Sequence, residues 1–176
     1  MPEKELFGLL LSAFVEGQTI RLTAYTNYSL RTLMYCALHP DRVVRIEDIA
    51  VAFGISKAHL LKSARQLGQL GYLQTIRGRA GGVKLGMPAE DIDIGAVVRA
   101  LEGASEVVEC FNPNTNSCPL IGECQLTGLF KRGLEAFFSA LDNTTLADVT
   151  GHRDALLAQF PAVSAAQLIS RLEIDN

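Results

Sequence analysis

The stretch that decides the fold is IEDIAVAFGISKAHLLKSARQLGQLGYLQTIRGRAGGVKLG, residues 46–86. Its first part predicts two short helices, because apolar residues recur at helical spacing on both sides of "GIS". Within that turn, Gly54 is suited to end the first helix and Ser56 to cap the second. Two helices joined by a short turn that contains glycine form the helix-turn-helix pattern. The second helix, residues 57–70, is therefore the candidate recognition helix.

After this helix the pattern changes from helical to extended. "YLQTIRG" and "GVKLG" predict two strands, and the glycines between them allow the positive φ angles that a tight hairpin needs. The hairpin tip presents Arg77 and Arg79 to solvent. "GRAGG" is also compatible with a phosphate-binding loop, but it joins two strands rather than a strand and a helix. With an earlier helix that buries Tyr25 and Tyr28, residues 21–88 predict a winged helix-turn-helix domain.

Charge is distributed unevenly along the 176 residues, although the net charge is only −3. Residues 21–87 contain ten Lys and Arg against three acidic residues, whereas residues 88–176 contain five against thirteen. A basic first half indicates a polyanion as partner, and with this fold the polyanion is double-stranded DNA. An ordinary solvated surface is the alternative for the same charges. The candidate DNA-contacting residues are Ser56, Lys57, His59 and Lys62 in the helix and Arg77 and Arg79 in the wing.

The second half of the chain is predicted to be helical with one long loop. A short helix begins near residue 94, and a longer helix spans residues 125–141 with an apolar face too broad for one helix to cover alone. That face packs either under the rest of the chain or on a second copy of the chain, and we expect the second arrangement. The fold class is mainly α with a small β-hairpin wing. The expected divisions are an N-terminal extension (1–20) that a mis-chosen start codon would explain, the DNA-binding domain (21–88), a loop and dimerisation helix (89–149), and a helical tail (150–176).

The N-terminal apolar run "LFGLLLSAFV" (residues 6–15) does not predict export or membrane insertion. It lacks a positively charged region before it, and it is too short to span a bilayer. We therefore expect a cytoplasmic protein without a membrane partner, in which thiols stay reduced.

Three of the four cysteines lie in "CFNPNTNSCPLIGEC", residues 110–124. Cys110, Cys118 and Cys124 are spaced more widely than the paired knuckles of a structural zinc site, and no His lies in the loop. Stable disulfides conflict with a reducing compartment. An iron-sulfur cluster fits wider intervals but usually has four protein ligands. Cys36 is expected to be a small buried hydrophobe rather than the missing ligand.

Several segments together resemble the Rrf-type iron-sulfur winged-helix transcription regulators, and most of all their nitric-oxide-sensing repressors. The resemblance covers residues 21–149, about three-quarters of the chain. The matching segments are "RLTAYTNYSLRTLMYCALHPDR", "IAVAFGISKAHLLKSARQLGQLGYLQTIRGRAGGVKLG", "IGAVVRALE", "ECFNPNTNSCPLIGECQLTGLF" and "LDNTTLADV".

This resemblance implies a non-enzymatic homodimer that represses transcription from a near-palindromic operator. It implies that Cys110, Cys118 and Cys124 hold an iron-sulfur cluster, either 4Fe-4S or 2Fe-2S, and that nitric oxide releases the DNA. Some relatives supply a fourth ligand from an Asp of the other subunit, and Asn27 occupies that position here. Relatives concerned with cluster biogenesis have a His where this chain has Thr127.

Three other functions compete with nitric-oxide sensing. A regulator that responds to iron or cluster status shares most of the same motifs. A small iron-sulfur redox protein would have no use for a basic winged helix. A regulator without a cluster would use the thiols as a redox switch.

Overall fold

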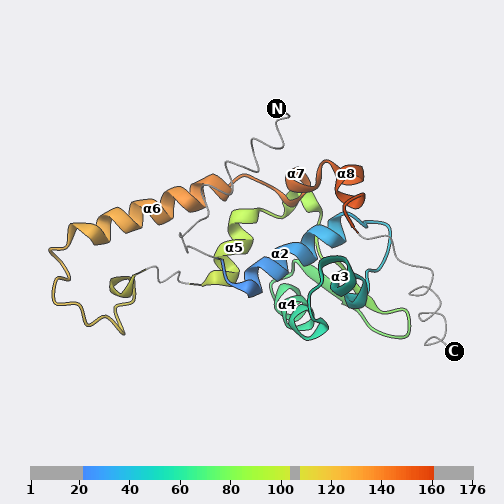
Figure 1. Cartoon of the computed structure of the whole chain (residues 1–176), viewed down its shortest axis with the longest axis horizontal. Coiled ribbons are helices and arrows are strands. Elements are labelled where there is room, and N and C mark those ends of the chain that lie inside the picture. Colours follow the sequence, from blue (N-terminus) through green and yellow to red (C-terminus); the bar gives the residue numbers. More distant parts are fainter. Residues whose placement is uncertain (1–21, 104–107, 161–176) are drawn as a thin grey trace.

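The computed structural model describes residues 22–103 and 108–160 (Figure 1). The extension at residues 1–20 and residues 161–176 of the tail lie outside this part of the chain. The described helices are α2 (Ala24–Ala37), α3 (Ile46–Phe53), α4 (Lys57–Gln69), α5 (Ile94–Glu102), α6 (Gln125–Leu141), α7 (Leu146–Thr150) and α8 (Arg153–Leu157). The strands are β1 (Leu73–Ile76) and β2 (Gly82–Leu85), and the short 3-10 helices are η1 (Ala89–Asp91) and η2 (Glu109–Phe111).

The winged helix-turn-helix prediction is confirmed. Helix α3 ends at Gly54, whose φ of 64° places it in the left-handed region that favours glycine. Helix α4 begins after Ser56, whose Oγ accepts a hydrogen bond from the backbone N–H of His59. The turn between the two helices is therefore made by the two residues that the pattern singled out.

The wing is an antiparallel hairpin of β1 and β2, with Leu73 opposite Leu85 and Ile76 opposite Gly82. A third segment joins it, because Val44 pairs with Val83 through two backbone hydrogen bonds of 2.8 and 2.9 Å. A side chain at Gly82 would collide with the carbonyl oxygen of Val44. Glycine is thus required there by the close approach of the backbone.

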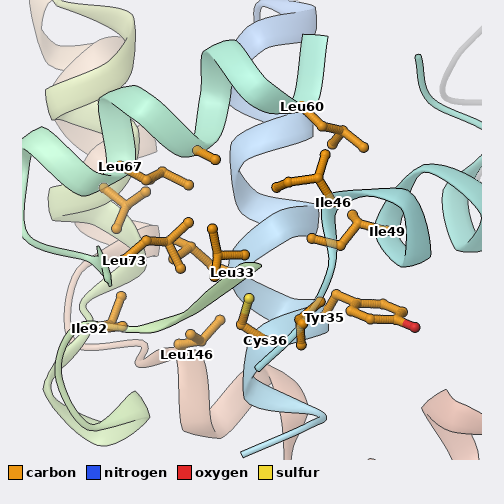
Figure 2. Close-up of a cluster of buried hydrophobic side chains, with 14 of the residues drawn as sticks. Leu33, Tyr35, Cys36, Ile46, Ile49, Leu60, Leu67, Leu73, Ile92 and Leu146 are labelled. Atoms are coloured by element: carbon orange, nitrogen blue, oxygen red, sulfur yellow. The ribbon is translucent and has the colours of Figure 1, made fainter. Parts of the chain in front are cut away.

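One hydrophobic core supports the helix-turn-helix. Leu33 of α2 is fully buried, and Figure 2 shows side chains from α3, α4 and β1 gathered around it. Fully burying one leucine stabilises the fold by roughly 1.5–3 kcal/mol. Cys36 belongs to the same core, and burial raises the pKa of its thiol to about 12. The prediction that Cys36 is a small buried hydrophobe is confirmed.

Helix α6 extends away from the helix-turn-helix, with the cysteine loop at its far end (Figure 1). None of its residues is buried. Its exposed apolar side chains share one face and are Leu126, Leu129, Phe130 and Phe137. Among the described residues, no helix is both long and apolar enough to cross a lipid bilayer.

Helix α5 connects α6 to the rest of the fold. The guanidinium of Arg99 donates two hydrogen bonds to the carboxylate of Asp142, directly after α6, and lies 4.4 Å from the centre of the Phe138 ring. At the other end of α5, Glu102 accepts hydrogen bonds from the backbone N–H and the hydroxyl of Thr23, the residue that caps α2. Helix α5 is therefore hydrogen-bonded at one end to the residue that follows α6 and at the other to the residue that caps α2.

The described part of the tail packs against α2. The Nε of Arg153 donates a 3.0 Å hydrogen bond to the carbonyl oxygen of Leu38, and the ring of Phe160 packs edge-on against those of Tyr35 and Phe53. Helix α7, which precedes this segment, begins with a capping box formed by Thr145 and Asp148.

Candidate nucleic-acid interface and cysteine loop

The N-terminal end of α4 presents a set of exposed polar side chains. Ser56, Lys57, His59 and Lys62 are all exposed, as are Arg77 and Arg79 in the wing. The structure thus brings the six predicted DNA-contacting residues to the surface of the recognition helix and the wing, which are the two elements that such a domain places on DNA.

His59 is held in place by two neighbours. Its Nδ1 lies 2.9 Å from the Oγ of Ser56, and its ring stacks on that of Tyr28 with the ring centres 5.7 Å apart. Tyr28 is half-buried on α2, so it reaches both the core and the start of the recognition helix. These contacts orient the imidazole before any ligand binds.

The two lysines of this end also have partners within the chain. Lys57 forms an ion pair with Glu47 at the start of α3, and this hydrogen bond lowers the pKa of the Glu47 carboxyl. Lys62 lies 5.5 Å from the centre of the Tyr25 ring. Both pairs are solvent-exposed, so each contributes little to stability and leaves the ammonium able to contact a phosphate.

A groove of about 860 Å³ lies between α4 and the wing, and we call it the wing groove. Lys57, Leu61 and Arg65 line it from α4, and residues 73–76 line it from β1. Of these, Leu61 stands out because it is a large apolar side chain with 49% of its surface exposed.

The three loop cysteines are free and half-exposed. Cys110 lies in η2, Cys118 lies in the loop, and Cys124 caps the N-terminus of α6. Hydrogen bonds from the backbone N–H groups of Thr127 and Leu126 lower the pKa of the Cys124 thiol. The thiolate, which is the form that binds metal, is therefore favoured at this position.

Thr127 connects two of these thiols. Its hydroxyl oxygen lies 3.4 Å from the Sγ of Cys110, and its backbone N–H reaches Cys124. The loop is closed elsewhere by Glu109, which accepts two 2.7 Å hydrogen bonds from Ser117. These hydrogen bonds thus join the two ends of the cysteine loop, at Cys110 and at the first turn of α6.

Three free thiols on one loop, one of them with a lowered pKa, form a donor set suited to iron-sulfur ligation. Within residues 22–103 and 108–160, no three His, Cys, Asp or Glu side chains are close enough together to hold a single metal ion. Asn27, the candidate fourth ligand, is exposed in the first turn of α2. Helix α2 belongs to the body of the molecule, whereas the cysteine loop lies at the outer end of α6 (Figure 1).

Residues 22–152 match the family Rrf2, described as an iron-dependent transcriptional regulator. The chain belongs to the Rrf2 family. The regulator NsrR of Bacillus subtilis is 44% identical over 139 residues, which make up 78% of this chain and 95% of that relative. Protein aau3 of Rhizobium meliloti is 40% identical over 134 residues, covering 76% of this chain and 87% of that one.

Solved Rrf2 structures share the fold. CymR of B. subtilis, titled the global cysteine regulator, matches with a TM-score of 0.61 at 25% identity, over 76% of this chain and 98% of CymR. IscR of T. potens matches with a TM-score of 0.62 at 23% identity, over 82% of this chain and 94% of IscR. The protein is therefore a DNA-binding transcriptional regulator of a non-enzymatic family, most like NsrR in sequence.

Sequence reasoning missed several residues that shape the two sites. Glu47 belongs to no sequence motif, and its ion pair with Lys57 depends on the relative orientation of α3 and α4. In the sequence Thr127 is only a departure from a family pattern, whereas in the structure it contacts both Cys110 and Cys124. The exposure of Leu61 is predictable from the sequence, because Leu61 follows the core residue Leu60 and falls outside the buried stripe of α4.

Proposed function

We propose that this Rrf2 regulator is a homodimeric repressor that senses nitric oxide through an iron-sulfur cluster held by Cys110, Cys118 and Cys124. One observation supports this most strongly. Three free, half-exposed thiols lie on the loop that leads into α6, an exposed amphipathic helix that is joined to a winged helix-turn-helix through α5. The three-cysteine loop, the exposed apolar face of α6 and the winged helix-turn-helix thus follow one another through the molecule.

DNA docking is proposed through α4 and the wing. Ser56, Lys57, His59 and Lys62 would contact base edges and phosphates from the major groove, since recognition helices act through their N-terminal residues. Arg77 and Arg79 at the wing tip would contact phosphates or a narrow minor groove. The basic balance of residues 21–87 supports this arrangement.

The proposed phosphate contacts of the wing arginines predict how operator affinity depends on salt concentration. Replacing Arg77 or Arg79 by Ala removes one phosphate contact, so the slope of log affinity against log salt concentration should become shallower by about 0.9. Fluorescence anisotropy of an operator duplex at several salt concentrations measures this slope. Lys84→Ala, in β2 behind the tip, is the matched control; slopes for Arg77→Ala and Arg79→Ala equal to that of the unaltered protein would show that these arginines make no phosphate contact.

The cysteine loop would hold the cluster through its three thiolates. When bound, the cluster supplies thiolate-ligated iron with a position that a small molecule such as nitric oxide can occupy. This chain contributes a low-pKa thiolate at Cys124, a loop closed by Glu109, and a location exposed enough for a diatomic molecule to enter. Asn27 of the partner subunit is proposed as the fourth ligand, because its side chain is exposed on α2.

Replacing Asn27 by Ala tests whether Asn27 is the fourth ligand of the cluster. We expect iron to be lost faster to a chelator, because one oxygen ligand is removed, while the dimer stays intact. The measurement is the rate of decay of visible absorbance in anaerobic protein. Ala24→Ser, exposed one turn earlier on α2, serves as control; identical decay in Asn27→Ala and the unaltered protein would exclude Asn27 as a ligand.

Coupling between the loop and DNA would pass along α6 and α5. Asp142 at the end of α6 is tied to Arg99, and Glu102 at the end of α5 is tied to Thr23 before α2. Since α2 packs on α4, a shift of α6 changes the relative position of the two recognition helices in a dimer. Two half-sites are contacted together only when these helices are about one DNA turn apart.

A second function is favoured by the description of the family as iron-dependent. In this alternative the regulator responds to iron or cluster status rather than to nitric oxide. The two functions are separated by comparing iron removal with nitric oxide treatment. Loss of operator binding on iron removal, with no effect of nitric oxide, would support the iron-status function.

A further inference from the structure

An exposed apolar side chain, Leu61, lies on the side of α4 that lines the wing groove. Lys57, Leu61 and Arg65 follow one another at intervals of four residues, so they share one helix face, and all three line the wing groove. Leu61 is 49% exposed, whereas its neighbour Leu60 and the later Leu67 are fully buried. The core is therefore filled without Leu61.

The chemistry of Leu61 restricts what it can recognise. Leucine has no hydrogen-bond donor or acceptor, so it cannot pair with the polar edge of a base. In the major groove, the C5 methyl group of thymine is the apolar feature that distinguishes one base from the others. Burying that methyl against an exposed leucine removes apolar surface of both partners from water.

We propose that Leu61 is a specificity-determining residue that recognises thymine by contact with its C5 methyl group. The inference rests on the proposed docking of α4 in the major groove. Lys57 and Arg65 lie one turn before and one turn after Leu61 and carry charges complementary to phosphates. They would hold α4 along the groove, and Leu61 would then point at the base edges between them. A protein partner for the same side chain is the competing occupant.

The test removes only the methyl group. An operator is first obtained by selection with the full chain from randomised duplex DNA, and each thymine is then replaced in turn by uracil, which lacks the C5 methyl. At one symmetry-related pair of thymines we expect affinity to fall about fourfold for each methyl group removed. This is the change in affinity that corresponds to the free energy of burying one such group. Leu61→Ala should bind more weakly and should show no loss at that pair.

Two further variants complete the test. Leu70→Ala, at an exposed leucine at the end of α4, should keep the thymine preference of the unaltered protein. Leu61→Gln replaces the apolar side chain by a polar one and should shift the selected sequence away from thymine at that pair.

The outcomes are distinguishable. A uracil scan without effect at every position, or a thymine preference that survives in Leu61→Ala, overturns the inference while leaving DNA docking intact. Failure of the full chain to select any sequence overturns both the inference and the proposed function.

Discussion

Replacing Cys118 by Ser should remove most of the iron and sulfide from anaerobically purified protein and weaken operator binding by about 5- to 150-fold, the usual range of allosteric coupling. The physical reason is that a serine hydroxyl stays protonated near neutral pH and replaces thiolate poorly at iron. The backbone N–H of Cys118 donates to the side chain of Asn116, so the loop keeps this hydrogen bond in the variant. Iron and sulfide analysis with operator titration measures both effects.

Cys36→Ala is the matched control for this variant. Cys36 is buried in the core on α2, and its thiol has a pKa of about 12, so it is not a candidate ligand. The control should keep its iron and its operator affinity. If Cys118→Ser retains iron, or if it loses iron and binds DNA as before, the loop does not act as the sensor.

Replacing Leu129 by Asp should convert the protein to a monomer and reduce operator affinity by about a hundredfold or more. Leu129 is 53% exposed on the apolar face of α6, and a carboxylate there would be buried without a partner in a dimer. A monomer contacts one half-site at a time and loses the benefit of simultaneous binding. Light scattering coupled to size exclusion, together with operator titration, gives the two quantities.

The matched control for the dimer prediction lies on the same helix. Ser139→Asp introduces the same charge on the opposite, polar face of α6, where Glu135 is also exposed. It should remain dimeric and bind the operator normally. Because no residue of α6 is buried in the single chain, Leu129→Asp should still fold. A dimeric Leu129→Asp variant would show that α6 is not the pairing surface.

The helix-turn-helix and the wing were predictable because local signals agree with one another. Gly54 and Ser56 mark the end of α3 and the start of α4, and the glycines of the hairpin mark its turn. The start of α6 was equally clear, because a long apolar face follows Cys124 directly. Fold class and the ends of α6 therefore needed only short-range information.

The organisation of the sites needed tertiary information. The ion pair of Lys57 with Glu47, the stacking of His59 on Tyr28 and the pairing of Val44 with Val83 all join segments whose orientation no local pattern reveals. The link from Arg99 to Asp142 spans 43 residues and depends on the angle between α5 and α6. The start of α7 is different, because Thr145 followed three residues later by Asp148 is a local pattern that indicates a capping box.

The most direct test of sensing is a titration of nitric oxide into anaerobically purified full-length protein, with operator affinity and visible absorbance recorded on the same samples. The proposed function predicts iron and sulfide in the purified protein, a change in absorbance on adding nitric oxide, and a parallel loss of operator affinity of about 5- to 150-fold. Operator affinity that stays constant while the absorbance changes, or tight operator binding by iron-free protein, would contradict it.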